Sequence, residues 1–581
     1  MFRVGRGDEV APSAGVTHLV EHLALFPFGQ RHYEYNGLVD AIATLFVASG
    51  TPAEVADHLT SLCRSLADLP LERLEIEERV LRDEAGRRSV GPPDHHSWLR
   101  WGLHGPGLAF ISEFGLWRLT PADVQDWSTR WFTAGNAAVV WAGPKLPAFE
   151  LPLPAGERRP PRPLIDLLNE PVWAVGAAAQ VTISFSLKRN SAYAAGQRIL
   201  AKRLQQQLRY ERGISYDVSL QYQPLSAELA TSTVWATCGA QDAGTVRDVV
   251  VGAADALATV GPTSDELAAD RDAMRRSMEQ PFHGQGEAGR LAIQDLLGAP
   301  AETLDQLADE LAQVTPEDVR AAFQAIRRTA ILTQPSGVAP PSDWFKPYPN
   351  LTPEQLPGRR FRNQADSVWS PIRRYPTLVV GDFGVSLAGR DGTGVGIRYR
   401  DVALAVRQAS GRLTVVHENG TQVDLDPAAW INSNVAIELA AAGIPPDRLV
   451  DVEDEPAGSR PSPRSWPGVI VLIYAGIAAF FALSFASVAG IPDPALGVIA
   501  PISSLLGFAG SGGLTWYVVA ELRRNLRAPL IGAGAFLALQ LAAVLFYQGR
   551  QSPALLVFLV PPFLYLLGQT RGRRLLGKRG A

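Results

Sequence analysis

Hydrophobic and polar positions divide the chain into four segments with different patterns. Residues 1–145 and 171–335 alternate the periodicity of amphipathic helices with that of strands. Residues 371–454 contain short β-rich runs between Gly, Asn and Asp turns. Residues 466–581 are dominated by long apolar stretches. Linkers rich in proline or charge are expected at 146–170, 336–370 and 455–465.

The last segment predicts a transmembrane region of four helices. The four apolar stretches are Pro467–Ile491, Leu496–Ala520, Ala528–Phe546 and Ala554–Leu567. The first three approach the roughly 20 residues that a bilayer core requires. The fourth is shorter and contains Pro561 and Pro562, which favour a kinked or partly inserted helix. The lipid bilayer is therefore a predicted partner.

Basic residues then predict the orientation in the membrane. They gather before the first stretch, between the second and third, and after the fourth: Arg460, Arg464, Arg523, Arg524, Arg527, Arg571, Arg573, Arg574, Lys578 and Arg579. The positive-inside rule places all these loops on the cytoplasmic side. We therefore expect a multi-pass protein of the inner (plasma) membrane, with the residues before Trp466 in the cytoplasm. The presence of only two cysteines, Cys63 and Cys238, agrees with a reducing compartment.

Net charge excludes one class of function, and the third segment suggests a fold. A formal net charge of −4 and a pI of about 6.2 give no sign of a nucleic-acid-binding protein.

Several hairpins in 371–454, followed by one helical stretch, resemble the pleckstrin-homology-like superfold. That resemblance implies a small β-rich domain that contacts lipid, a partner or the rest of the chain, and it names no function.

The sharpest chemical signal is the segment SAGVTHLVEHLALFPFG. Ser13 can cap a helix that starts at about Ala14. His18 and His22 are four residues apart and so share one helix face, where two imidazoles can bind one zinc ion. Glu21 projects close by and can take a proton from an activated water. This is the His-x-x-Glu-His order of the inverzincins, although histidines on an apolar helix are often only core residues.

A catalytic zinc ion requires a third protein ligand from another element. The segment LPLERLEIEERVLRDEAGRR predicts a helix with Glu77 and Glu84 on one face, seven residues apart. Val80 and Leu81 lie between them, so this face differs from a purely charged surface. The other glutamates of the segment fit a solvated face.

His18, Glu21 and His22, followed by the helix sequence EERVLRDE, resemble the insulinase/pitrilysin family of zinc metallopeptidases. The resemblance covers about residues 1–335. It implies that Glu84 is the third zinc ligand and that Glu77 is an acid that orients it. The segment LRYERGISYDVSL resembles a family motif in which an arginine and a tyrosine bind substrate and stabilise the transition state. In this chain they are Arg209 and Tyr216, whose roles depend entirely on the resemblance.

The sequence therefore predicts an α+β protein with two repeated α/β peptidase halves, in which helices pack on antiparallel sheets. A β-rich domain and the four-helix transmembrane region follow. The predicted function is zinc-dependent cleavage of short or unfolded peptides at the cytoplasmic membrane face, by a homodimer or with a related partner subunit. The alternatives are an inactive scaffold of the same fold, and a membrane transporter or sensor. The family's opening strand has no counterpart, so one unpaired sheet edge is expected.

Overall fold

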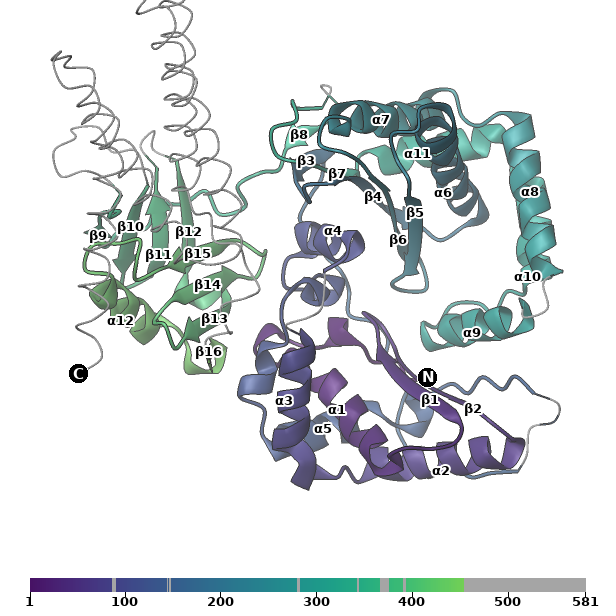
Figure 1. Cartoon of the computed structure of the whole chain (residues 1–581), viewed down its shortest axis with the longest axis horizontal. Coiled ribbons are helices and arrows are strands. Elements are labelled where there is room, and N and C mark those ends of the chain that lie inside the picture. The colour runs from purple at the N-terminus through teal and green to yellow at the C-terminus, as the bar shows by residue number, and fades with distance from the viewer. Residues whose placement is uncertain are drawn as a thin grey trace, which may run out of the picture. The chain divides into compact units, whose positions relative to one another are not determined.

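The computed structural model describes residues 1–453, except 86–89, 144, 146–147, 280–282, 342–343, 366–375 and 390–392. The chain divides into two units, Met1–Glu455 and Pro456–Ala581. All described residues belong to the first unit, which is mixed α/β (Figure 1).

In the first half, residues 1–145, three helices pack around a fourth. The α-helices described there are α1 Val16–Leu25, α2 Pro52–Ala67, α3 Leu74–Ala85, α4 Pro92–Trp101 and α5 Pro121–Trp131. Leu19, Val20 and Leu23 of α1 are fully buried in the core of this half. Helix α1 contacts α2, α3 and α5, and strand β1 covers it from another direction (Figure 1). The apolar face predicted for the motif helix is thus the centre of the fold.

Short 3-10 helices connect these elements and carry residues of the candidate site. They are η1 Arg6–Asp8, η2 Ala11–Ser13, η3 Phe26–Phe28, η4 Leu71–Arg73, η5 Gly105–Phe110, η6 Phe114–Trp117 and η7 Ala134–Asn136.

The sheet of the first half is small. Strand β1 (Glu34–Val39) pairs antiparallel with β2 (Thr44–Ser49). Phe2 forms antiparallel bridges with Thr44 on one side and Ala137 on the other. The predicted unpaired edge is therefore covered at Thr44 by the first residues of the chain.

The second half, residues 171–335, is a larger layer of helices on a sheet. Its strands are β3 Val172–Val175, β4 Gln180–Lys188, β5 Val218–Pro224, β6 Leu229–Thr237 and β7 Ile331–Gln334. With β8 (Lys346–Pro347) they form a six-stranded sheet in the order β5-β6-β4-β7-β3-β8. Strand β3 runs parallel to β7 and β8, so the sheet is mixed and the prediction of an antiparallel sheet is wrong for this half.

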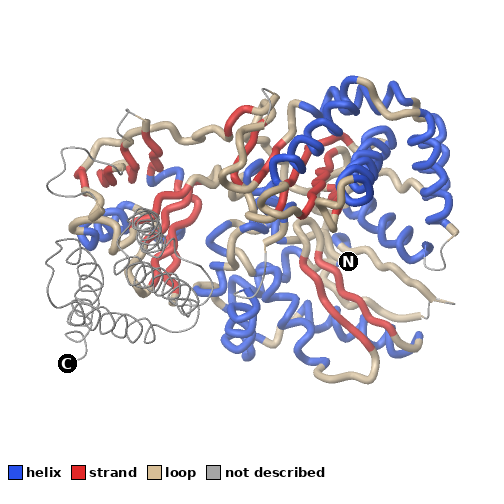
Figure 2. Tube along the Cα trace, turned by 45° about the horizontal axis from the view of Figure 1, so that its top comes forward, coloured by secondary structure: helices blue, strands red, loops and turns tan. Residues whose placement is uncertain are grey.

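The two faces of this sheet are covered by different parts of the chain. Its helices are α6 Ser191–Leu204, the π-helical η8 Gln205–Glu211, α7 Ala243–Thr259, α8 Ser264–Met278, α9 His283–Leu296, α10 Leu304–Gln313 and α11 Pro316–Arg327. Helices α6, α7 and α11 build the core on one face (Figures 1 and 2). On the other face, His96 of α4 is hydrogen-bonded to the hydroxyl groups of Ser184 (2.7 Å) and Thr333 (2.9 Å). This buried histidine joins the two halves.

Residues Arg359–Val452 form what we call the β-rich module. Its strands are β9 Arg359–Phe361, β10 Thr377–Gly381, β11 Gly384–Ala388, β12 Gly394–Arg398, β13 Val402–Gln408, β14 Leu413–His417, β15 Gln422–Leu425 and β16 Leu449–Val452. They form two four-stranded sheets, ordered β12-β11-β10-β9 and β15-β14-β13-β16. Helix α12 (Ser433–Gly443) and the short η9 (Tyr399–Asp401) and η10 (Pro446–Arg448) complete the module. Strand β16 follows the helix and pairs parallel to β13, which the predicted hairpin pattern lacks.

Two predictions are corrected: the four-helix transmembrane region and the multi-pass location in the inner membrane. Among the described residues, no helix is long and apolar enough to cross a membrane. The longest of those named above, α7, has 17 residues and belongs to a protein core, whereas a bilayer core needs roughly 20 apolar residues. The four apolar stretches from Pro467 to Leu567 lie outside the described residues.

Two of the predicted linkers are bonded to folded elements of the chain. The segment before β3 is irregular, yet Arg159 N–H donates to the Asn136 side chain and Leu167 N–H donates to Arg100 C=O. The segment after β7 contributes β8 and β9 to two different sheets. Both segments therefore lie against folded elements in the part of the chain that is described.

Candidate metal centre

Helix α1 begins at Val16 and is capped by a carboxylate from outside the helix. Gly15 precedes it with a positive φ of 102°, and no side chain of the N-cap residue closes the helix. The two oxygens of Glu9 accept hydrogen bonds from the amides of Gly15 (2.8 Å) and Thr17 (2.9 Å) instead. The Ser13 hydroxyl donates to Val10 C=O, so the prediction that Ser13 caps the helix at about Ala14 is wrong. A carboxylate at this end also suits the helix dipole.

Burial perturbs the titration of this cap. Removal from water raises the pKa of Glu9 from 4.5 to about 7, against the lowering effect of its hydrogen bonds with Thr17 and Gly15. A carboxyl group whose pKa is raised by folding stabilises the folded state fully below its unfolded pKa. That contribution is lost as the pH rises through the folded pKa.

We therefore expect stability to depend on pH through Glu9. Between pH 4.5 and pH 7, its ionisation should lower the free energy of unfolding by about 3 kcal/mol, because each pKa unit corresponds to about 1.4 kcal/mol. Urea unfolding of the wild type and Glu9→Gln across this range measures the effect. The variant should gain stability relative to the wild type as the pH rises. A difference that stays constant with pH would contradict the prediction.

His18, Glu21 and His22 converge on one point of α1. The Nε2 atoms of the two histidines each lie 3.8 Å from Oε2 of Glu21. One ligand atom from each of the three residues can be chosen so that all lie within 4.8 Å of one another. The spacing read from the sequence thus places the three side chains together in the folded chain.

The opposite ring nitrogens are each held by a carboxylate. Nδ1 of His18 lies 3.1 Å from both oxygens of Glu113, and Nδ1 of His22 lies 3.4 Å from Oε2 of Glu77. A carboxylate that accepts the Nδ1 proton fixes the tautomer that leaves Nε2 free as a ligand. The donor set therefore fits a zinc ion bound by the two Nε2 atoms.

Glu84 lies beside the same cluster. Its Oε2 is 3.8 Å from Nε2 of His22, and its side chain is 58% exposed at the end of α3. Two donors at about 2.1 Å from one zinc ion are no more than about 4.2 Å apart, so Glu84 and His22 can share an ion. The three residues whose ligand atoms all lie within 4.8 Å of one another are His18, Glu21 and His22, without Glu84. Glu77, expected from the resemblance to orient Glu84, contacts His22 and accepts a hydrogen bond from Arg73 (3.1 Å).

Glu113 and Arg6 are site residues that the sequence reasoning missed. Arg6 Nη2 lies 3.2 Å from Glu113 Oε1. Burial alone would raise the pKa of Glu113, but the hydrogen bond and charge of His18, together with Arg6, hold it below its ordinary value. Burial would lower the pKa of His18, and the same carboxylate raises it above its ordinary value. The only signal in the sequence was a lone acid in the apolar run AFISEFGLW.

Glu21 is buried against the backbone of strand β1. Its residue exposure is 5%, and a Cβ at Gly37 would lie 1.8 Å from Oε1 of Glu21. The glycine therefore leaves the space that the carboxylate occupies. Burial raises the pKa of Glu21, while the two histidines act in the opposite direction. A higher pKa makes a carboxylate a better proton acceptor near neutral pH.

Arg209 and Tyr216 lie together in the second half. The Arg209 guanidinium carbon is 5.1 Å from the centre of the Tyr216 ring, and Tyr216 is 83% exposed. Arg209 belongs to the π-helical turn η8, a geometry that is frequent at functional sites. No hydrogen bond or ion pair found within the described residues links either side chain to His18, Glu21 or His22.

Comparisons with known proteins identify similar folds only among solved structures. No protein-family model matches the chain, and no curated protein matches it. A peptidase M16 inactive domain from Pseudomonas fluorescens has a TM-score of 0.46 and 15% identity over 58% of this chain and 93% of its own. A protease from Helicobacter pylori has a TM-score of 0.46 and 14% identity, covering 57% of this chain and 92% of its own.

Pitrilysin is also similar, with a TM-score of 0.44 and 13% identity over 58% of this chain and 42% of its own. The structural neighbours thus include members of the M16 (pitrilysin/insulinase-like) peptidase family, one of them an inactive domain. At these identities the similarity concerns the fold alone.

Proposed function

We propose that this protein is a zinc-dependent endopeptidase that cleaves short or unfolded peptides. The observation that carries the proposal is the orientation of the two histidines. Both Nε2 atoms lie 3.8 Å from the Glu21 carboxylate, and that of His22 also lies 3.8 Å from Glu84, while Glu113 and Glu77 hold the two Nδ1 atoms. A pair of histidines that served only the core would need no such set of four acids.

The residues divide into distinct chemical roles. His18, His22 and Glu84 would hold a zinc ion, which would supply a Lewis acid that acidifies water and polarises the scissile carbonyl. Glu21 accepts the proton of the attacking water and passes it to the leaving amine. Glu113 and Glu77 keep the imidazole rings in place through their Nδ1 atoms.

Arg209 and Tyr216 are proposed to hold the peptide backbone or the developing oxyanion. Tyr216 is exposed, and neither side chain has a described contact with the histidines. Both residues could therefore bind a peptide at the zinc site of a partner, either in a homodimer or with a related subunit. The peptide is the only substrate class that the proposal names.

Metal removal tests the proposal directly. The purified full chain should contain about one zinc per chain and should cleave a mixed library of unfolded peptides. Dialysis against a zinc chelator should abolish cleavage, and added zinc should restore it. Zinc content is measured by atomic spectroscopy and cleavage by mass spectrometry of the products.

The other outcomes separate the alternatives. Stoichiometric zinc without cleavage would indicate an inactive scaffold or a missing partner subunit. Cleavage that persists after metal removal would contradict the metallopeptidase proposal, as would a folded protein that binds no zinc.

A further inference from the structure

The two acids that organise helix α1 come from short irregular segments. Glu9 lies between η1 and η2, and Glu113 immediately precedes η6. These segments touch each other, because Gly115 N–H donates to Ala14 C=O at 2.9 Å. Neither segment belongs to a long helix or to a sheet, so their positions depend on what packs against them.

The β-rich module packs against these same segments. One buried apolar cluster joins Ala11 of η2 to residues of the module, with Phe114 and Trp117 of η6 packed at its border. The module contributes Ala403, Leu404 and Val406 of β13, Val416 of β14 and Val450 of β16. The sheet β15-β14-β13-β16 is therefore buried on both faces: one face lines the module's own core and the other covers η2 and η6.

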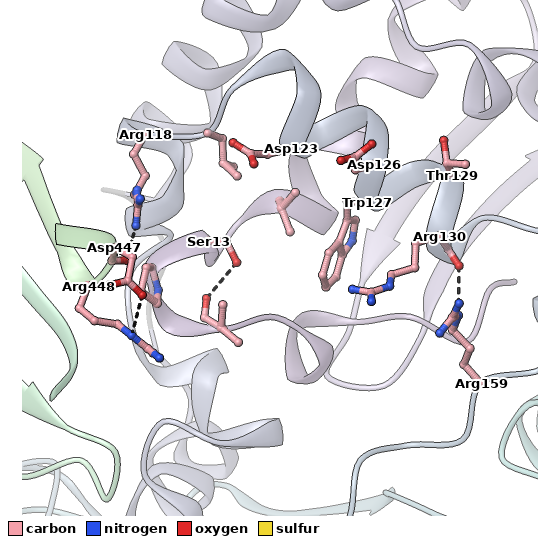
Figure 3. A pocket seen from close by; sticks show the side chains of 14 residues that line it. Ser13, Arg118, Asp123, Asp126, Trp127, Thr129, Arg130, Arg159, Asp447 and Arg448 are labelled. Atoms are coloured by element: carbon pink, nitrogen blue, oxygen red, sulfur yellow. Dashed lines mark hydrogen bonds and ion pairs between the residues drawn. The ribbon is translucent and has the colours of Figure 1, made fainter. Parts of the chain in front are cut away.

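Close backbone contacts fix the module in this place. Leu103 N–H donates to Glu418 C=O at 2.8 Å. A Cβ at Gly102, whose φ is +58°, would lie 2.4 Å from backbone atoms of Glu418 and Asn419. Arg118 donates a hydrogen bond to Asp447 C=O on one side of a cavity that Ser13 and Trp127 also line (Figure 3). Such contacts allow little freedom to slide or rotate.

We propose that the β-rich module is a clamp that positions the metal centre through Glu9 and Glu113. It presses η2 and η6 onto the start of α1, so that Glu9 reaches the amides of Gly15 and Thr17 and Glu113 reaches Nδ1 of His18. Loss of the clamp frees both acids at once. The expected loss of zinc affinity rests on the proposed function. The expected loss of order in the N-terminal turn of α1 is independent of it.

Val406 offers a way to disturb the clamp without touching the metal centre. Its side chain is buried in the junction with the first half and not in the module's own core. Val406→Asp places a charge in this junction. Val406→Thr keeps the shape of the side chain but adds a hydroxyl group, and it serves if the aspartate variant does not fold. Phe383→Ser changes an exposed residue (63%) of the module away from the junction. Val234→Ala lowers global stability from the core of the second half.

Two measurements on the full chain test the proposal. Competition with a chromophoric chelator gives the zinc affinity, which should fall about tenfold or more in the Val406 variants, as is typical when outer-shell partners of a ligand are lost. Hydrogen exchange of the metal-free protein should show faster exchange at the amides of Gly15 and Thr17. Phe383→Ser and Val234→Ala should leave both quantities near those of the wild type.

The two readouts keep the hypotheses apart. If the wild type binds no zinc, the proposed function is wrong. The hydrogen-exchange rates of Gly15 and Thr17 still test whether the module positions the start of α1. If both Val406 variants exchange faster only within the module, with Gly15, Thr17 and the zinc affinity unchanged, the clamp is refuted. Equal effects in Val234→Ala would also refute it, because they would follow from global stability alone.

Discussion

Replacing Glu21 with glutamine is expected to lower peptide cleavage by about a thousandfold, within the range of roughly 10²–10⁴ that general acid–base catalysis supplies. Glutamine has nearly the same size and fits the space left by Gly37, but it cannot accept a proton. Zinc should stay bound at wild-type stoichiometry, because His18, His22 and Glu84 are unchanged. Initial rates on one peptide, measured beside zinc content, give the result.

A matched control comes from the same strand that shelters Glu21. Glu34→Gln removes an exposed carboxylate from β1 and should leave cleavage within about twofold of the wild type, as surface changes usually do. If Glu21→Gln retained most of the activity, Glu21 would not be the base. If it lost zinc together with activity, Glu21 would act as a ligand, which its 3.8 Å distances to both Nε2 atoms also permit.

The parts of the site that follow from local spacing were predictable. His18, Glu21 and His22 lie on one helical turn, so their convergence needs only the geometry of an α-helix. The same reasoning placed Glu77 and Glu84 on one face of α3, and both lie within 3.8 Å of an imidazole nitrogen of His22. In each case one helix puts the residues on a common face, whereas the approach of Glu77 and Glu84 to His22 also needs α3 to pack against α1.

The parts that depend on distant contacts were not predictable from spacing. Glu113 meets His18 across 95 positions of the chain, and no local rule connects them. The pairing of β3 with β7 likewise joins segments about 160 residues apart. The cap of α1 is a local contact that the usual residue preference still missed: Ser13 fits that preference, yet the buried carboxylate of Glu9 accepts from the amides of Gly15 and Thr17.

The pattern of apolar positions was informative about segments and less so about their packing. It divided the described part of the chain into two halves and a β-rich region, and all three belong to one compact unit, Met1–Glu455. It gave no sign that the sheet containing β13 is buried on both faces, because Leu404 and Val406 read as ordinary strand residues. Contacts between segments decide this, and single-sequence periodicity contains no information about them.

Replacing Gly15 with alanine is expected to weaken both the fold and the metal centre. The φ of +102° is one that side chains rarely adopt, and the new Cβ would lie 2.8 Å from Cβ of Glu113 and 3.1 Å from Cγ of Leu116. Strain and overpacking together should cost about 2–4 kcal/mol of stability. Because the clash pushes Glu113 away from His18, zinc affinity should also fall by about ten- to a hundredfold.

The comparison that isolates this effect is Gly337→Ala. Gly337 has a φ of +83° and no atom within 4 Å of a built Cβ, so alanine there adds backbone strain without a clash. Urea unfolding and zinc competition should show a smaller loss of stability in Gly337→Ala, at about 1–2 kcal/mol, and an unchanged zinc affinity. Equal zinc affinities in Gly15→Ala and the wild type would mean that Glu113 keeps its place despite the clash. In that case His18 would not depend on the close approach that Gly15 allows, and the hydrogen bond between Glu113 and His18 would have to be maintained by the packing of η6 alone.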